Sequence, residues 1–521
     1  MAETESGREF GRGPEPGAAR EPGPGAARES APGPGLEPER GSGRAPETGP
    51  GNETGRESGR RPADGHADTI RRQRQFFAGG ATRETAFRRA ALRRLKAGLL
   101  KHEADLLAAL KADLGKPEAE AWLSEIAPVM MELNLAIRRV DRWSRPRRAK
   151  TPAALFGATS RIYREPYGVA LIIAPWNYPV LLALRPLVAA VTAGNCAVVK
   201  PSELAPSVSA AIARLIADVF PPEHVACVEG GVEVGTALLD QRFDYIFFTG
   251  SPRVGRIVCE KAASQLVPVT LELGGKSPCI VAEDADLRLA AKRIVWGKLL
   301  NGGQTCVAPD YLVVHRRVKD ALVREIQRCA EHLYGTDMLR HERFPRVLNE
   351  RQFRRLAGHL QGARILCGGR TDETALRIEL TLLDQADWDD PVMQDEMFGP
   401  ILPVLTYDDL GEAIRQINRR PKPLACYVFS ESKAVQARVI REMPFGGGCV
   451  NDTVIHLSNP HLPFGGIGDS GIGRYHGKAG FDLFSHQKSV LKQTTLFDWP
   501  VRYVTDAGII RRLKTFVTRF T

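Results

Sequence analysis

Short apolar runs alternate with helical segments in the middle of this chain, and this alternation restricts the fold more than any other feature. The run at 168–174 is wholly apolar and is followed by helical spacing at 179–193. A strand that is apolar on both faces is typical of a parallel sheet covered by helices. The same pattern predicts strands at 196–200, 225–229, 245–249 and 267–271, with helices at 206–220 and 253–263. We therefore expect right-handed βαβ units, whose ligands bind at the carboxyl ends of the strands.

A second alternating series begins near residue 279 and continues to about 450. The predicted fold class is therefore α/β, with two tandem α/β domains at 66–271 and 272–486. Two long helices, at 82–113 and 117–142, are expected before the first series. The segments 159–166 and 487–503 are strand-like, and we expect them to form a small β flap that pairs subunits.

Residues 1–65 form an arm of low complexity, rich in Gly, Pro, Arg and Glu. Its large apolar residues are almost limited to Phe10 and Leu36, so it cannot bury enough surface to offset the entropy of ordering. We predict that this arm is disordered. Its composition does not indicate a function.

The cysteines and charges exclude several classes of protein. The nine cysteines stand singly, without any C-x-x-C pair, which argues against a disulfide framework or a zinc site and favours a reducing compartment. The net charge is +11, but no basic run carries interleaved aromatic residues, so we expect no nucleic acid partner. No apolar stretch is long enough to span a membrane, and no apolar signal-peptide core is recognised near the N-terminus. We expect a cytoplasmic protein without a bound metal.

Three residues at strand ends or in glycine-rich turns are candidates for chemistry. Cys306 ends the segment Asn-Gly-Gly-Gln-Thr-Cys, Glu272 follows a predicted strand before Gly-Gly, and Asn177 lies in Pro-Trp-Asn-Tyr-Pro. A cysteine can form a thioester, a carboxylate can activate water to break it, and an amide can donate to an oxyanion. Taken singly, each has a plainer reading: a buried thiol, a solvent-facing glutamate and an Asx turn.

Two further segments suit a nucleotide. Lys200 and Glu203 follow the second strand, where they could bind ribose hydroxyls or simply be solvated loop charges. Gly250, Ser251 and Gly255 lie where another strand leads into a helix, whose N-terminus would receive a phosphate. Pro252 removes one potential N–H donor there but suits the first helical turn. The segments 396–400 and 463–466 are tight turns by this reasoning alone.

Together these segments resemble the aldehyde dehydrogenase superfamily over about residues 68–505. The matching segments, in the family's order, are Pro-Trp-Asn, Lys-Pro-Ser-Glu, Phe-Thr-Gly-Ser, Glu-Leu-Gly-Gly-Lys, Gly-Gln-Thr-Cys and Glu-x-Phe-Gly-Pro. The stretch from Asn451 to His486 is similar to the class 3 branch, which includes fatty and aromatic aldehyde dehydrogenases. The resemblance makes 66–271 a Rossmann-like NAD-binding domain and 272–486 the catalytic domain.

The resemblance also implies roles for individual residues. Cys306 would be the nucleophile, Asn177 and the Cys306 N–H would hold the oxyanion, and Glu272 would be the general base. The cofactor would be held by the residues Lys200, Glu203, Gly250, Ser251, Gly255, Glu396 and Phe398. Glu203 would repel a 2′-phosphate, so NAD is the expected cofactor, with NADP accepted as well.

The substrate follows from the expected channel walls. Trp176, Tyr178, Val454 and Leu457 are candidates for these walls, and their few charges favour an apolar aldehyde, aliphatic or aromatic. The alternatives are a relative that transfers the acyl group to coenzyme A, a semialdehyde-specific relative and a non-catalytic scaffold. We expect a homodimer. The basic, partly apolar segment 509–520 is expected to pack on the dimer partner rather than on an anionic membrane.

Overall fold

A computed structural model describes residues 62–498, 500–503 and 506–520. The arm predicted to be disordered therefore lies outside the described residues, except for its last four positions, which belong to helix α1 (Pro62–Ala78). The described residues all belong to one compact unit of the chain.

The N-terminal helices differ in detail from the two long ones expected. The segment 82–113 contains α2 (Thr85–Lys101) and α3 (Glu103–Leu114), which are separated at His102 (φ −96°, ψ 8°). The second predicted helix comprises α4 (Glu118–Ala121), a π-helical turn (Trp122–Ile126) and α5 (Ala127–Ser144). Such turns often occur at functional sites because the extra residue displaces the side chains beside it.

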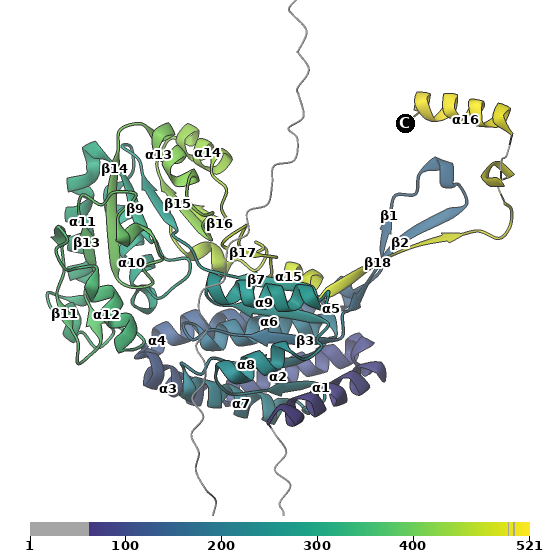
Figure 1. Ribbon diagram of the computed structural model, residues 1–521, viewed down its shortest axis with the longest axis horizontal. Coiled ribbons are helices and arrows are strands. Elements are labelled where there is room, and N and C mark those ends of the chain that lie inside the picture. The colour runs from purple at the N-terminus through teal and green to yellow at the C-terminus, as the bar shows by residue number, and fades with distance from the viewer. Residues whose placement is uncertain (1–61, 499, 504–505, 521) are drawn as a thin grey trace, which may run out of the picture. The chain divides into compact units, whose positions relative to one another are not determined.

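The first α/β domain has a six-stranded sheet (Figure 1) with the order β17-β7-β6-β3-β4-β5. Its strands are β3 (Val169–Ile173), β4 (Cys196–Lys200), β5 (Val225–Cys227), β6 (Tyr245–Thr249), β7 (Val269–Glu272) and β17 (Gly471–Ile472). The neighbours pair in parallel except β17, which is antiparallel to β7. The direction in which successive strands are added reverses between β3 and β6, and a crevice for ligands opens at such a switch point.

Helices cover both faces of this sheet: α6 (Pro179–Ala193), α7 (Pro206–Val219), α8 (Val232–Leu239) and α9 (Pro252–Ser264). Nearly every residue of α6 is buried, because it contacts β3 and β4 and also α2 and α5. A helix that is apolar all round is stable only in such surroundings.

The second domain has a seven-stranded sheet with the order β10-β13-β14-β9-β8-β15-β16. Its strands are β8 (Pro278–Val281), β9 (Tyr311–His315), β10 (Ile365–Cys367), β13 (Thr381–Leu383), β14 (Ile401–Tyr407), β15 (Ala425–Phe429) and β16 (Gly447–Val450). The helices are α10 (Leu287–Leu299), α11 (Lys319–Tyr334), α12 (Glu350–Gly358), α13 (Leu410–Asn418) and α14 (Lys433–Glu442). A short ladder joins β11 (Thr371–Asp372) to β12 (Arg377–Ile378). The predicted α/β class with two sheets is confirmed.

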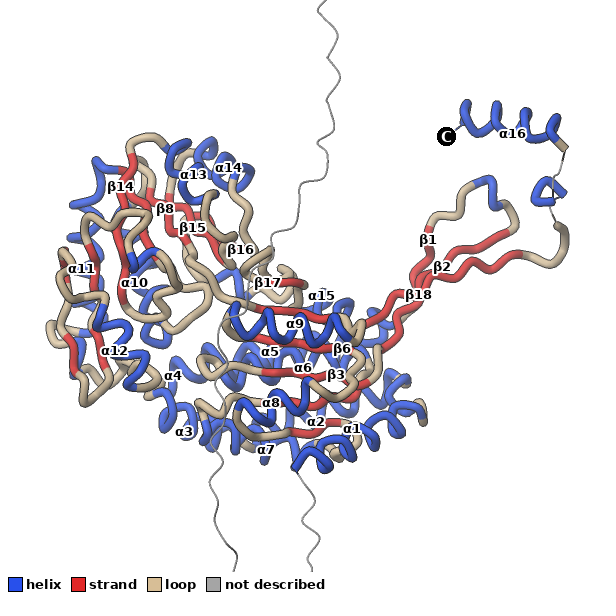
Figure 2. The backbone as a smooth tube through the Cα atoms, in the orientation of Figure 1, coloured by secondary structure: helices blue, strands red, loops and turns tan. Residues whose placement is uncertain are grey.

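A third sheet is antiparallel and joins β1 (Arg147–Ala149), β2 (Ala158–Pro166) and β18 (Ser485–Gln493), as Figure 2 shows. The register of β2 and β18 runs from the pair Pro166–Ser485 to the pair Ala158–Gln493. The strand expected to reach residue 503 ends at Gln493, and helix α16 (Ala507–Phe520) follows a short 3₁₀ turn. In the described part of the chain, no helix combines the length and apolarity that a membrane span requires.

Candidate active site

Two cavities meet at Cys306, whose side chain lines both of them. One has a volume of about 390 Å³ and mostly apolar walls. The other has a volume of about 730 Å³ and extends over the loops that follow β3, β6 and β7. A reactive thiol placed where the two cavities join can contact one ligand from each side.

The turn that presents Cys306 depends on unusual backbone conformations. Asn301, Gly302 and Gly303 all have positive φ, at 52°, 62° and 82°. A Cβ on Gly303 would also collide with the carbonyl of Gly399. Burial raises the pKa of the Cys306 thiol, and the carboxylates of Glu396 and Glu272 act in the same direction. The thiol therefore requires a base, or a charge brought by a ligand, before it can attack.

Glu272 is the last residue of β7 and pairs with Gly471 of β17, which returns from the end of the second domain. Its side chain is 3% exposed, and neither carboxylate oxygen has a hydrogen-bond partner among the described residues. Burial raises the pKa of Glu272 well above its ordinary value, and Arg474 opposes this only in part. A carboxylate with a raised pKa is a stronger base, as a general base near neutral pH must be.

Asn177 follows β3 at the switch point, and its Nδ2 donates to the carbonyl of Gln304 at 3.0 Å. That bond joins the Asn177 side chain to the turn that carries Cys306. An amide nitrogen has two N–H donors, so one remains for a ligand. The amide lines the larger cavity with Cys306 and Glu272.

The larger cavity has features of an anion site. Ser251 is the N-cap of α9, and its Oγ accepts a hydrogen bond from the Val254 N–H at 3.4 Å. Gly250 lies where a Cβ would fall 2.5 Å from the ring of Phe248. Cations on its wall are Arg253, Arg256, Lys276, Arg351, Arg355, Arg420 and Lys422. A helix N-terminus among cations favours a phosphate ligand.

Glu396 and Phe398, from the second domain, also line this cavity. Burial and the charge of Asp310 raise the pKa of Glu396, while the Gly275 N–H lowers it. Phe398 has a φ of 50°, and its ring lies edge-on to Trp176 with 5.4 Å between ring centroids. Burial lowers the pKa of Lys298 to about 8, although the charges of Asp310 and Glu396 oppose this, and the Lys298 Nζ has no hydrogen-bond partner among the described residues.

Three of the predicted cofactor residues do not line this cavity. Lys200 and Glu203 form an ion pair with 3.0 Å between Nζ and Oε2, at the end of β4. That strand is one place further from the switch point than β3. Gly255 packs α9 against β7, because a Cβ there would fall 2.6 Å from Cδ2 of Leu273.

The smaller cavity contains Tyr178, Val454 and Leu457, whereas Trp176 lines the larger one instead. Sequence reasoning did not identify most of its wall, which includes Leu123, Leu181, Trp296, Leu300, Leu333 and Tyr334. These residues come from five elements: the π-helical turn, α6, α10, the 3₁₀ turn directly after α10, and α11. No local sequence pattern marks them as neighbours. Among the described residues, no group of three His, Cys, Asp or Glu side chains is arranged to hold a metal.

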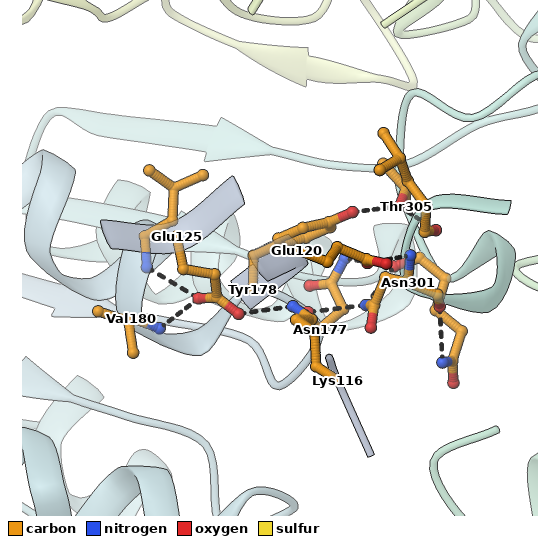
Figure 3. A network of polar contacts seen from close by, with 11 residues as sticks. Lys116, Glu120, Glu125, Asn177, Tyr178, Val180, Asn301 and Thr305 are labelled. Atoms are coloured by element: carbon orange, nitrogen blue, oxygen red, sulfur yellow. Dashed lines mark hydrogen bonds and ion pairs between the residues drawn. The ribbon is translucent and has the colours of Figure 1, made fainter. Parts of the chain in front are cut away.

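A buried polar network beneath the loop that carries Asn177 was also missed (Figure 3). It contains Lys116, Glu125, Glu120 and Asn301. Its only local sequence signal is a lysine between Gly115 and Pro117, and Gly and Pro in this arrangement are typical of a helix end.

Comparisons with known proteins show which family the chain is similar to. The model of the aldehyde dehydrogenase family matches residues 63–490. The 4,4'-diaponeurosporen-aldehyde dehydrogenase of Staphylococcus aureus is 45% identical over 443 residues, which cover 85% of this chain and 96% of that protein. Human aldehyde dehydrogenase family 3 member B1 is 45% identical over 424 residues, 81% of this chain and 91% of that protein. The substrate-bound structure of Staphylococcus aureus AldH has a TM-score of 0.85 at 44% identity and covers 86% of this chain and 99% of that chain.

Proposed function

Because this chain belongs to the aldehyde dehydrogenase family, in its class 3 branch, we propose that it oxidises an apolar aldehyde to the carboxylic acid with NAD(P)⁺. The observation that carries the proposal is the position of Cys306 at the junction of an apolar cavity and a cation-lined cavity. The aldehyde would enter through the first cavity and the dinucleotide would occupy the second.

The chemistry begins at Cys306. Its sulfur adds to the aldehyde carbon as the thiol proton leaves to Glu272, and the aldehyde oxygen becomes an oxyanion. The Asn177 amide and the Cys306 N–H donate to that oxyanion. Loss of hydride from the carbon then leaves a thioester on Cys306. Glu272 first releases the thiol proton to bulk water and then takes a proton from the hydrolytic water, whose hydroxide adds to the thioester carbon. The acid leaves as the C–S bond breaks, and the sulfur of Cys306 takes the proton back from Glu272.

The larger cavity fits a dinucleotide. A Cβ on Gly274 would fall 2.9 Å from Cδ of Glu396 and closer still to Oε2. The backbone and this carboxylate can therefore approach each other this closely only because residue 274 is a glycine. Ser251 and the N-terminus of α9 would hold the pyrophosphate, and Glu396 the ribose next to the nicotinamide. The bound nicotinamide supplies the hydride acceptor.

NAD is the cofactor we favour over NADP. Lys200 and Glu203 would meet the adenosine ribose, and the Glu203 carboxylate, 39% exposed, would repel a 2′-phosphate. Because Lys200 lies beside it, NADP would still bind, though more weakly. Gly255 would serve the same region by allowing α9 to pack closely on Leu273.

The walls of the smaller cavity favour an aliphatic, long-chain or aromatic aldehyde. Tyr178, Val454 and Leu457 are part of a lining in which apolar surface predominates. Arg185, a charged residue of this lining, is paired with Glu132 at 3.3 Å. Arg343 also lines this cavity, so the preference for an apolar aldehyde rests on the predominance of apolar surface, against which a charged semialdehyde would lose hydration.

We also propose a cytoplasmic homodimer. The nine cysteines are all free, as is typical of a reducing compartment. β18 is an edge strand of nine residues with exposed Val490 and Leu491, and an unpaired edge of this length can pair with a strand of a second copy. For the basic helix α16 we favour contact with the partner subunit over contact with a membrane. Light scattering of the purified chain measures the assembly.

A panel of aldehydes from short aliphatic through long-chain to aromatic, assayed with NAD⁺ and with NADP⁺, tests the proposal. We expect kcat/KM to rise with apolar bulk and to be higher with NAD⁺. Cys306→Ala should abolish turnover with the fold intact, whereas the control Cys329→Ala, a cysteine outside both cavities, should retain it. Turnover by Cys306→Ala would refute the assignment.

A further inference from the structure

Lys116 and Glu125 form an ion pair with 2.6 Å between Nζ and Oε1, and both side chains are completely buried. Neither side chain lines either of the two cavities that meet at Cys306, so neither is in position to touch a ligand there. Removing two charges from water is costly, and a buried pair often stabilises a fold no more than apolar residues would. The place of this pair therefore calls for an explanation other than stability.

The lysine ammonium directs its donors to one loop. Besides Glu125, it donates to the main-chain carbonyl of Asn177 at 3.1 Å and lies 4.1 Å from the centre of the Tyr178 ring. An ammonium group has three N–H donors, so Glu125, Asn177 and Tyr178 account for all of them. Two of the three contacts are with consecutive residues of the loop that carries the candidate oxyanion donor.

The glutamate holds the other end of that loop. Its Oε2 accepts hydrogen bonds from the N–H groups of Val180 and Leu181, at 2.9 and 3.2 Å, in the first turn of α6. A carboxylate at a helix N-terminus is favourable because the helix dipole is positive there. Glu125 belongs to the π-helical turn, whose extra residue brings this side chain toward α6.

The same loop is joined to the turn that bears the nucleophile. The Asn177 carbonyl also accepts from Asn301 Nδ2 at 2.8 Å, and the Asn177 side chain donates to the Gln304 carbonyl. Glu120 Oε1 accepts from the Asn301 N–H at 2.7 Å and so holds that residue in its left-handed conformation. Figure 3 shows these contacts as one continuous network.

We propose that Lys116 and Glu125 are positioning residues, which fix the Asn177 peptide so that its side-chain amide faces the oxyanion formed at Cys306. This inference rests on the proposed function, because it assigns the pair to the same reaction. Without the pair, the Asn177 carbonyl retains only Asn301, and the peptide can rotate about that bond. A shift of about 1 Å in a positioned group costs on the order of 100-fold in rate.

The test is the double variant Lys116→Met/Glu125→Gln, which removes both charges and keeps an acceptor for the Val180 N–H. The measured quantities are the rate constant of the first NADH burst, the dissociation constant of NAD⁺, and the rate at which iodoacetamide alkylates Cys306. Alkylation forms no oxyanion, so a general loosening of the site would change it, whereas a misplaced amide would not. We expect the burst to slow 10- to 100-fold, with NAD⁺ binding and alkylation changed less than twofold.

Asn177→Ala separates this inference from the proposed function. If Lys116 and Glu125 act through the amide, the double variant should cost less than twofold in the Asn177→Ala background. Suppose that Asn177→Ala is slow but the double variant is as fast as the parent, or that the losses caused by Asn177→Ala and by the double variant multiply when combined. Either result would overturn the positioning role and leave the proposed function standing. A fast Asn177→Ala enzyme would instead refute the proposed oxyanion donor.

Two further variants keep the result interpretable if the double variant folds poorly. Glu125→Gln alone preserves Lys116 and should slow the burst about 3- to 10-fold, in the direction expected from partial release of the loop. Lys319→Met breaks an ion pair with Asp384, which retains Arg364, away from both cavities, and should leave the burst unchanged. A burst unaffected by Glu125→Gln in a folded enzyme would contradict the proposal.

Discussion

Gly274→Ala is predicted to damage cofactor binding while leaving the fold intact. The backbone at Gly274 is not in the left-handed region, so alanine adds no conformational strain there. The added Cβ would lie 2.9 Å from Cδ of Glu396, whereas ordinary contacts begin at 3.4 Å. The carboxylate must therefore move by at least 0.5 Å, the difference between these two distances, and its nearer oxygen Oε2 must move further.

That displacement sets the expected magnitude. The crowded carboxylate is the end of the flexible Glu396 side chain, so it can rotate away from the new Cβ. The loss in the free energy of unfolding should therefore stay below about 2 kcal/mol. A displacement approaching 1 Å at a positioned group corresponds to a loss of roughly 10- to 100-fold in kcat/KM for NAD⁺. Steady-state kinetics at varied NAD⁺ measures the loss, and urea denaturation measures the stability.

Gly358→Ala is the matched control, since a Cβ there would meet nothing within 4 Å and the residue ends α12. It should leave both kcat/KM and stability close to those of the parent. A Gly274→Ala enzyme with normal NAD⁺ kinetics would show that Glu396 does not need its observed position. An unfolded Gly274→Ala protein would show that the Glu396 side chain cannot move aside and that the backbone is displaced instead.

Three other predictions follow from the site. Glu272→Gln should flatten the pH dependence of stability. A carboxyl whose pKa is raised in the folded state stabilises the fold at low pH, and this contribution is lost as the pH rises above the ordinary pKa of 4.5. In chemical denaturation, the free energy of unfolding of the variant should therefore rise relative to that of the parent between about pH 5 and pH 8. Gly303→Ala should cost at least about 1–2 kcal/mol, because φ is 82° and the new Cβ would meet the Gly399 carbonyl; a thermal melt equal to that of the parent would contradict it. Leu333→Trp, which fills part of the apolar cavity, should lower kcat/KM for long-chain aldehydes more than for propanal, and an equal loss for both would place the substrate elsewhere.

The strands that build the site could be predicted because burial on both faces leaves a distinctive signal. β3, β4 and β6 lie where continuous apolar runs indicated them. The strand expected at 267–271 is β7 (Val269–Glu272), which begins two residues later and ends one residue later, at Glu272. This shift matters, because Glu272 is a paired strand residue whose backbone is fixed by Gly471.

The missing parts of the site depend on contacts that no local pattern encodes. The break at His102 between α2 and α3 has neither Gly nor Pro to mark it. Trp176 and Tyr178 are two residues apart yet line different cavities, because the chain turns into α6 at Tyr178, where φ is −132° and ψ is 66°. Lys116 is distant in sequence from Asn177, and a lysine beside a proline gives no hint of burial.

The environment of Glu272 links the two domains energetically. A buried carboxyl without a hydrogen-bond partner costs about 1–3 kcal/mol, more when charged. The fold nevertheless buries this carboxyl, because the chain returns from the second domain and β17 covers the edge of β7. Within β17, Gly471 has a φ of 147° and packs against the Leu271 carbonyl. A side chain at that position would push β17 away and admit water, which would lower the pKa of Glu272 toward its ordinary value and weaken it as a base. The stability lost by burying this carboxyl and the basicity it gains therefore have the same structural cause.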